Sequence, residues 1–279
     1  MIINIQHDID LHAHTHLSDG KLPPVELVGL FREAGVTTMA ITDHDSIGAH
    51  LELSKHDLDG IEVIPGVEIS CSAAGREIHV VGLDFDLNNA AMLAFLAEQQ
   101  QRRRERIRLY GDKLESLGLE GVNQAIDAVK AESITRTHLA EILIQLGYAK
   151  NNQQVFKRYL GRKARAYVKI EWPSLEQAVA VIKAAGGTAV LAHPGRYQLS
   201  NRQLKELIRQ FKAAGGQGIE LTYSNIDEKT ARWLLERAEE HGLFASQGSD
   251  FHDPAWPWVK PGRFPALKSG VEPVWSLWQ

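Results

Sequence analysis

Residues 174–195 read SLEQAVAVIKAAGGTAVLAHPG, and this stretch decides the fold class. Its first half spaces apolar side chains as a helix does, and Gly186-Gly187 ends that helix. Its second half is a short apolar run at 188–192, typical of a buried strand, and His193 follows that strand directly. The stretch predicts a helix–strand unit with a chemically competent side chain at the carboxyl end of the strand.

The same alternation of strand and helix extends over most of the chain. Repeated strand–helix units imply a parallel sheet, and six or seven such units suggest a barrel, so we expect an α/β fold. A turn is expected at Gly75. The expected strands are 9–14, 36–42, 61–64, 67–70, 78–85, 188–192, 218–222 and 243–247, and the expected helices are 25–34, 46–59, 174–185, 202–213 and 227–240.

The middle of the chain has a different character. Residues 90 to about 165 carry long helical patterns and no convincing strand. Residues 102–169 hold 15 Lys and Arg against 7 Asp and Glu, a net +8, while the rest of the chain has −12. We expect a discontinuous barrel, residues 1–95 and 170–279, interrupted by a basic helical insertion domain at 96–169. The charge run at 102–106 is typical of a solvated helix face.

Composition excludes several classes of protein. The 279 residues have a net charge of −4, which does not suit stable binding of duplex DNA through bulk charge. The one cysteine, Cys71, cannot form a disulfide within the chain and is expected in the core. No signal peptide or membrane span is recognised, so we expect a cytoplasmic protein without a membrane partner. The tryptophans at 256, 258, 275 and 278 are expected to anchor a tail to the barrel.

Histidine and carboxylate side chains gather where the expected strands end. In a parallel barrel those ends line one mouth, so these side chains are expected to meet there. One His-x-His pair would be a weak signal, but nitrogen and carboxylate donors without thiolate suit Mn, Zn or Fe, and nine donors exceed the need of one ion. We expect two or three divalent ions, with manganese favoured over zinc or iron. The nine donors are His12, His14, Asp19, His44, Glu68, His79, His193, Asp250 and His252.

Six motifs occur in an order and spacing that resembles the polymerase and histidinol phosphatase (PHP) family. The motifs are HAHTHLSDG at 12–20, TDHD at 42–45, GVEI at 66–69, His79, AHPGR at 192–196 and GSDFH at 248–252. The resemblance covers residues 8–95 and 170–253. It implies a distorted (β/α)7 TIM-like barrel and a phosphoesterase site with two or three metal ions, in which a water that bridges two ions attacks phosphorus.

The resemblance also implies how the ions are shared among the donors. His12, His14, Glu68 and Asp250 would hold one ion. Glu68, His79 and His193 would hold a second ion, with Glu68 bridging. Asp19, His44 and His252 would hold a third.

Within the family, the chain looks most like the stand-alone branch that removes phosphate from 3′,5′-nucleoside bisphosphates. Some members of that branch also trim short RNA from the 5′ end. The segments SITRTH at 133–138 and PGRY at 194–197 carry this closer resemblance. A small nucleotide or a short RNA is therefore the expected substrate.

Five residues are expected to serve the substrate or the reaction. Arg136 and Arg196 are expected to clamp phosphate, because a guanidinium group matches two oxygens at once. His138 and Tyr197 are expected to contact the substrate, Tyr197 by stacking. Asp43 is expected to assist catalysis at the rim of the site or to orient a neighbouring histidine.

Three functions remain open at this point. The first is a metal-dependent phosphatase that removes the 3′-phosphate of 3′,5′-nucleoside bisphosphates. The second is a 5′→3′ exoribonuclease on short RNA, in which the arginine-rich helix tracks the strand. The third is a regulatory module that binds metal or phosphate without catalysis. Oligomeric state is not predicted.

Overall fold

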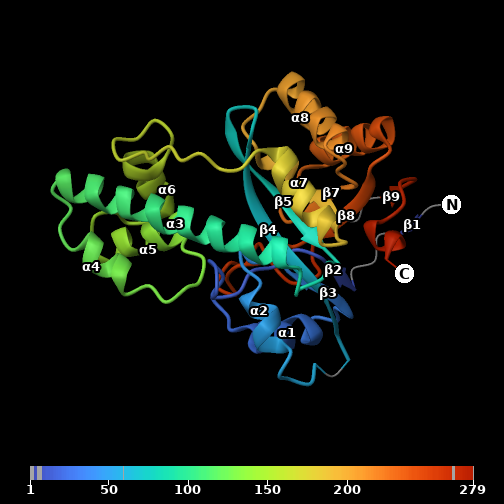
Figure 1. The fold of residues 1–279 in the computed structure, drawn as a ribbon, viewed down its shortest axis with the longest axis horizontal. Coiled ribbons are helices and arrows are strands. Elements are labelled where there is room, and N and C mark those ends of the chain that lie inside the picture. The colour runs from blue at the N-terminus through green and yellow to red at the C-terminus, as the bar shows by residue number, and fades with distance from the viewer. Residues whose placement is uncertain (1–2, 5–7, 59, 266–267, 279) are drawn as a thin grey trace.

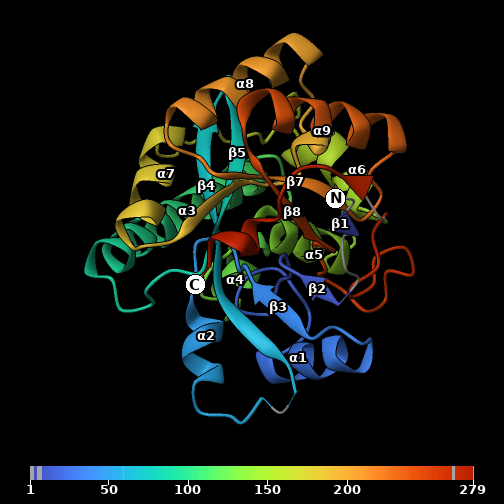
Figure 2. The same ribbon diagram turned by 90° about the vertical axis from the view of Figure 1, so that its right-hand side faces the viewer.

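Seven strands form one curved sheet in a computed structural model, which describes residues 3–4, 8–58, 60–265 and 268–278. The strands follow one another around the sheet in chain order, as Figures 1 and 2 show. They are β2 (Ile9–Asp10), β3 (Thr38–Ile41), β4 (Glu62–Ala73), β5 (Arg76–Leu83), β6 (Thr188–Leu191), β7 (Gly218–Tyr223) and β8 (Phe244–Gly248). The predicted α/β fold with a distorted, TIM-like barrel is confirmed.

Segments at the two edges of the sheet meet and nearly close it. The backbone N–H of Leu11 donates to the carbonyl of Gln247 at 3.1 Å, and that of His14 donates to the carbonyl of Phe251 at 2.9 Å. The N–H of Asp250 donates to the carbonyl of His12, also at 2.9 Å. Residues near the two ends of the chain therefore lie side by side at the mouth of the barrel.

The expectation of a parallel sheet is wrong for β5, which runs antiparallel to both β4 and β6. Ala74 and Gly75 form the turn between β4 and β5, and both have positive φ, 49° and 67°. Such a two-residue turn joins antiparallel strands directly, so no crossover helix separates them. Strand β4 is continuous through the expected segments 61–64 and 67–70, and the hairpin sets His79 on β5 beside Glu68 on β4.

Five helices pack around the barrel (Figures 1 and 2). They are α1 (Pro24–Glu33), α2 (Gly48–Leu53), α7 (Leu175–Ala184), α8 (Asn201–Ala213) and α9 (Glu228–His241), with a short turn η2 (Pro194–Arg196) after β6. In α8, Leu204, Leu207, Ile208 and Phe211 form one buried stripe, as the helical period requires. Among the described residues, no helix is both long enough and apolar enough to cross a membrane.

The helices between β5 and α7 project to one side of the barrel (Figure 1). They are α3 (Ala90–Ser116), α4 (Val122–Asp127), α5 (Arg136–Gln145), α6 (Asn152–Val155) and the π-helical turn η1 (Phe156–Leu160). Their apolar side chains, among them Tyr110, Leu114, Leu139 and Leu143, form a buried cluster drawn only from residues 107–168. This part of the chain thus has a core of its own.

The charge run at 102–106 is not simply a solvated helix face, and that expectation is wrong for two of its arginines. Arg103 and Arg106 are only 5% and 4% exposed. The Nε of Arg103 donates to Asp45 at 2.7 Å, and Arg106 forms two hydrogen bonds to Glu77. The first half of α3 lies against the barrel, so these arginines face carboxylates there rather than water.

The end of the chain follows the expected pattern with one exception. Strand β1 (Ile3–Asn4) pairs with β9 (Lys268–Ser269), and a short turn η3 (Val274–Leu277) follows. Trp256, Trp275 and Trp278 pack against apolar clusters of the barrel, which confirms their anchoring role. Trp258 is 62% exposed and belongs to none of these clusters; its ring stacks on that of Trp256, with 6.4 Å between the ring centroids. Cys71 is fully buried in the core, as predicted.

Candidate metal centre

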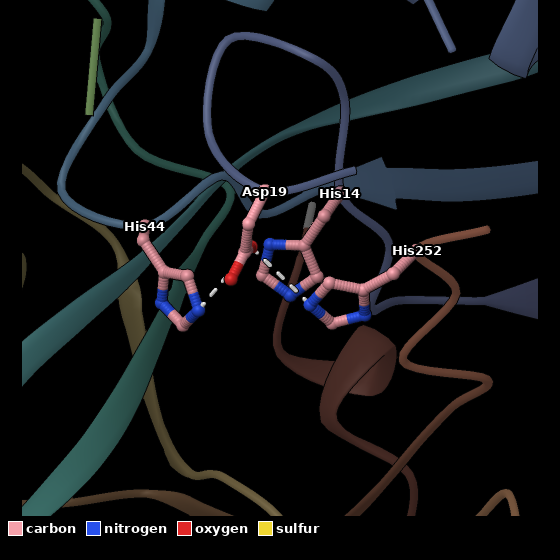
Figure 3. Close-up of side chains that lie close together, drawn as sticks. All are labelled: His14, Asp19, His44 and His252. Carbon is pink, nitrogen blue, oxygen red and sulfur yellow. Dashed lines mark ion pairs between the residues drawn. The ribbon is translucent and has the colours of Figure 1, made fainter. Parts of the chain in front are cut away.

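All nine predicted donors gather at the mouth of the barrel. They form four overlapping groups, and within each group the candidate donor atoms lie within 4.8 Å of one another. Figure 3 shows the largest of these groups. The groups are His14, Asp19, His44 and His252; His12, Glu68 and His193; His12, His14 and Asp250; and His44, Glu68 and His79.

His12 and His14 follow β2 and face the same way, because side chains two residues apart on an extended chain share a face. Both rings are fully buried, and their Nε2 atoms are 3.1 Å apart. The Oδ1 of Asp250 lies 3.4 Å from the Nε2 of His12 and 3.2 Å from that of His14. Three donor atoms from the two ends of the chain therefore converge on one point.

Glu68 lies at the centre of the site. Its Oε1 is 2.9 Å from the Nδ1 of His79 and 2.8 Å from the Nε2 of His193. Its Oε2 is 2.9 Å from the Nδ1 of His44 and 3.5 Å from the Nε2 of His14. One carboxylate whose two oxygens face different sets of histidines has the arrangement that a bridging ligand needs.

Asp19 organises the group in Figure 3. Its Oδ1 lies 3.6 Å from the Nε2 of His44 and 3.3 Å from the Nε2 of His252. The hydroxyl of Thr135 donates to the other oxygen at 3.1 Å. Since Thr135 caps α5, this bond ties the projecting helices to the donor cluster.

Two buried oxygens test whether these residues fit a cation. The Oδ1 of Asp19 and the Oε2 of Glu68 are inaccessible to solvent and accept no hydrogen bond from the described residues. A buried carboxylate oxygen without a donor is costly unless a positive charge satisfies it. Both oxygens face histidine nitrogens, and this set of nitrogen and oxygen donors suits a divalent transition metal. The residues fit the implied ions.

The electrostatics of the site favour charged carboxylates. Burial alone would raise the pKa of Glu68, but the charges of His79 and His44 outweigh burial and hold it well below its usual range. Burial would lower the pKa of His79, yet Glu68 raises it to about 10, and Asp19 likewise raises the pKa of His252 to about 9. Near neutral pH both imidazoles are protonated in the metal-free chain, so a cation that binds there must displace their protons.

Two donors are held by strained backbone. His193 and Asp250 have φ angles of 28° and 53°, in the left-handed region of the backbone that residues other than glycine rarely adopt. Each follows a strand, β6 or β8, and the turn redirects the side chain toward the mouth. Strain of this kind persists where the surrounding structure fixes a functional side chain.

Arg136 and Arg196 line a cavity of about 270 Å³ next to the donors, as their predicted roles require. Arg196 forms an ion pair with Asp250 and lies over the ring of Tyr223 at 5.1 Å. The Nη2 of Arg136 is 3.3 Å from the Oε2 of Glu77. Both guanidinium groups thus already face oxygen atoms at the edge of the donor cluster.

His138, Tyr197 and Asp43 do not line this cavity. The Nδ1 of His138 accepts the N–H of Thr135 at 3.0 Å and helps to cap α5. The hydroxyl of Tyr197 accepts the N–H of His79 at 2.8 Å.

Asp43 lies beneath the donors, where it accepts hydrogen bonds from the backbone N–H and hydroxyl of Thr15 at 2.8 and 2.6 Å. The hydroxyl of Ser18 donates to the same carboxylate at 2.5 Å. Asp43 thereby holds the turn between two donors, His14 and Asp19. These contacts favour the orienting alternative, although through the turn and not through His12 or His44 directly.

Glu220 is a site residue that sequence reasoning missed. It is buried on β7, and its Oε1 lies 2.6 Å from the Nδ1 of His12. Its other oxygen accepts the backbone N–H of His193. A carboxylate behind a ligating histidine fixes the tautomer and orientation of the ring. The available signal was a glutamate inside the otherwise apolar strand GIELTY, because charged side chains are rarely buried without a partner.

Comparison with known proteins gives a family match over most of the chain. The family model described as "PHP domain" matches residues 10–224. The "5'-3' exoribonuclease Rnm" of Escherichia coli is 42% identical over 275 residues, which cover 97% of this chain and 93% of that protein. The "3',5'-nucleoside bisphosphate phosphatase" of Chromobacterium violaceum is 38% identical over 273 residues, 96% of this chain and 95% of that protein.

Two solved structures share the fold. One is described as an amidohydrolase from Chromobacterium violaceum with bound sulfate and no metal; it has a TM-score of 0.88 and 37% identity and covers 97% of this chain and 95% of that one. The other, from Bifidobacterium adolescentis, is described as a metal-dependent phosphoesterase. It has a TM-score of 0.79 and 26% identity, with 94% of this chain and 92% of that one covered.

Proposed function

The chain belongs to the PHP family and is a metal-dependent phosphoesterase, and from this premise we propose that it removes the 3′-phosphate of 3′,5′-nucleoside bisphosphates. The observation that carries the proposal is the cavity beside the donors, which four arginines line: Arg103, Arg106, Arg136 and Arg196. Its volume of about 270 Å³ lies just below the usual range of about 300–1,000 Å³ for small-molecule sites, so it favours a small ligand over a longer chain. Several guanidinium groups in one small cavity suit a ligand with two phosphates.

We propose that the nine gathered donors hold two or three divalent ions, with manganese the expected metal and zinc or iron the alternatives. Glu68 would contribute to more than one ion, because its two oxygens face different histidines. Bound divalent ions neutralise the charge on phosphate and lower the pKa of an attacking water.

We also propose that residues 96–169 form a separate helical domain inserted into a barrel made of residues 1–95 and 170–279, which the separate apolar cluster supports.

The chain's own residues bind and orient the substrate. Arg196, which pairs with Asp250, would bind phosphate oxygens with its guanidinium group, and Asp250 would be one of the residues that hold a cation. Arg136 approaches the same cavity from the projecting helices and clamps the second phosphate, while Glu77 holds its guanidinium in place. Glu220 keeps the Nε2 of His12 directed toward the donors, and Asp43 fixes the turn at 15–18.

A phosphate-release assay tests this proposal. Wild type loaded with Mn²⁺ should release phosphate from adenosine 3′,5′-bisphosphate and not from adenosine 5′-monophosphate, which lacks the 3′ group. Asp250→Asn should lose bound metal and nearly all turnover. The matched control is Asp57→Asn, since Asp57 is exposed and has no described partner; it should behave as wild type. Full activity of Asp250→Asn, or equal release from both nucleotides, would contradict the proposal.

The second candidate is 5′→3′ exoribonuclease activity on short RNA. It is supported by the 42% identity to a protein with that name and by arginines that continue beyond the cavity. The alternative of a regulatory module without catalysis is set aside, because the family match and the relatives are those of hydrolases. Shortening of a 5′-phosphorylated oligonucleotide, assayed beside the bisphosphate, decides whether the enzyme uses one substrate or both.

A further inference from the structure

A second hollow of about 700 Å³ adjoins the cavity at the metal donors, and we call it the distal groove. We propose that the distal groove binds the downstream nucleotides of a single-stranded oligonucleotide while its first phosphodiester lies at the metal donors. This inference rests on the exoribonuclease form of the proposed function. The two hollows share Glu77, Arg106, Arg136 and Arg196, so a chain of phosphates can pass from one to the other past three arginines.

The distal groove lies between parts of the chain that are far apart in sequence. One wall is the β4–β5 hairpin with Arg76, and the other is the segment 161–172 that leaves the projecting helices, with Arg162 and Lys169. In Figure 1 this yellow segment passes beside the hairpin, and the backbone N–H of Ser72 donates to the carbonyl of Pro173 at 2.8 Å. The groove is therefore a built feature between barrel and insertion.

The charge of the distal groove points to an anion. Arg76, Arg162 and Lys169 have no ion pair or hydrogen bond through their side chains with any residue that the structure describes. By contrast, the three shared arginines already have carboxylate partners, Glu77 or Asp250. Glu171 also lines the groove, so the lining has six cationic and two acidic side chains. An excess of unpaired cations in one hollow of a chain with net charge −4 favours a polyanion.

The aromatic side chains point to single-stranded rather than duplex nucleic acid. Tyr167 and Tyr197 line the groove half-buried, and Trp172, 6% exposed, lies beneath the guanidinium groups of Arg103 and Arg106 at 5.2 and 5.5 Å. The indole N–H of Trp172 has no acceptor among the described residues. The guanidinium groups cover the ring of Trp172, so the two half-buried tyrosines are the rings on which unpaired bases can stack, whereas a duplex presents only its backbone.

Two residues that line the distal groove and not the smaller cavity allow the proposal to be tested. Arg162 and Lys169 line only the distal groove, so a nucleoside bisphosphate held in the smaller cavity does not reach them. The double variant Arg162→Ala/Lys169→Ala should lower kcat/KM for 5′-phosphorylated hexa-adenylate about tenfold through KM, and should leave kcat/KM for adenosine 3′,5′-bisphosphate unchanged. The slope of log affinity against log salt for hexa-adenylate should fall by about 1.4, the effect of two lost contacts to a single strand.

The matched control removes two positive charges from a different surface. Lys229 and Arg232 line a hollow on α9 that shares no residue with the distal groove, so Lys229→Ala/Arg232→Ala should change neither substrate's kinetics. Two results would overturn the proposal: unchanged hexa-adenylate kinetics in Arg162→Ala/Lys169→Ala, or an equal loss on both substrates, which would assign these residues to the mononucleotide site.

A binding measurement separates failure of this inference from failure of the proposed function. Fluorescence anisotropy with labelled hexa-adenylate on metal-loaded wild type in the cold, or on Asp250→Asn, needs no turnover. Tight binding that weakens about tenfold on adding Arg162→Ala/Lys169→Ala supports the groove even if no substrate is hydrolysed. Binding that is insensitive to this double change, or competition by blunt duplex RNA as strong as by the single strand, overturns it.

Discussion

Glu220 illustrates how a residue that touches no substrate can control the donors. It holds the Nδ1 of His12 at 2.6 Å and the backbone of His193, so it orients two candidate ligands at once. Glu220→Gln keeps the shape but removes the charge. We expect the dissociation constant for Mn²⁺ to rise about 10- to 100-fold, the usual effect of losing such a partner.

A chelator-competition titration measures this constant. Glu228→Gln is the matched control, because Glu228 is an exposed glutamate on α9 that pairs with Arg232, far from the donors; the Mn²⁺ affinity of this variant should equal that of wild type. Near-ultraviolet circular dichroism checks that both variants are folded. A folded Glu220→Gln variant with wild-type affinity would show that the contact does not matter.

His50 gives a prediction about pH. His50 is part of α2, and its ring is buried on the inner side of this helix, with Nε2 at 2.9 Å from the carbonyl oxygen of Ile41. Burial lowers the pKa of His50 below the usual 6.5. The unfolded chain therefore binds a proton more readily than the folded chain below pH 6.5. The stability that neutral His50 contributes is complete above pH 6.5 and is lost as pH falls through the region below it.

Urea denaturation of the metal-free protein tests this. The difference in free energy of unfolding between wild type and His50→Gln should be largest at pH 8 and should shrink toward pH 5. Its slope should not exceed about 1.4 kcal/mol per pH unit, the limit for one proton. Leu53→Ala, in the same helix and not titratable, should give a difference from wild type that does not change with pH. A constant difference for His50→Gln would refute the linkage.

For individual residues, the sequence predicts the candidate metal donors better than the residues that hold those donors in place. Seven of the nine gathered side chains lie in segments that follow strands, where the rule for parallel barrels places functional groups, while Glu68 and His79 lie within β4 and β5 and stand in motifs. Glu220 and Glu77 lie within strands and are named by no motif, so only the three-dimensional structure shows what they contact. His138 and Tyr197 stand in motif segments, yet they contact backbone groups next to the cavity.

Helix α3 joins the barrel to the helices that project from it. Arg103 pairs inside the molecule with Asp45, which also accepts the N–H of Ser70 at 3.0 Å. Removing one partner of a buried ion pair leaves an uncompensated charge, so Arg103→Ala should lower the free energy of unfolding by about 3–5 kcal/mol. The neighbouring Arg104 is exposed, so Arg104→Ala should change the free energy of unfolding by less than about 0.5 kcal/mol. Chemical denaturation compares them; equal effects would contradict the burial of Arg103.

Elements with strong periodicity were predictable, and those set by tertiary contacts were not. Helices α7, α8 and α9 begin and end within one or two residues of their predicted bounds, because apolar stripes, serine or aspartate caps and glycines agree there. The direction of β5 depended on the two-residue turn at Ala74 and Gly75. Gly75 indicates a turn, but the positive φ at Ala74 is not expected from an alanine. The buried face of α3 depended on carboxylates elsewhere in the chain, which a charge run does not reveal.

Across the whole molecule, the donors join the two edges of the sheet. His12 and His14 follow β2, whereas Asp250 and His252 follow β8, so shared cations would act as clamps across the seam. Ions that bind only the folded state stabilise it by about 2.7 kcal/mol when present at 100 times their dissociation constant. We therefore expect excess chelator to lower Tm by several degrees.

Differential scanning calorimetry with and without Mn²⁺ measures this shift. Asp250→Asn should show a smaller shift than wild type, and Asp57→Asn should show the full shift. A Tm of wild type that does not respond to Mn²⁺ or to chelator would argue against the cluster as a cation site. The barrel class was predictable from the alternation of strands and helices, but the distal groove required the relative placement of segments about 90 residues apart.

The position of the donors on both sides of this seam also has a consequence for the synthesis of the protein. The donor cluster draws on residues 12 and 14 and also on residues 250 and 252, so it cannot exist before residue 252 has been synthesised. A chain still emerging from the ribosome has its first histidines but no partners for them. Any activity that depends on the complete donor cluster is therefore absent from a nascent chain that has not reached residue 252.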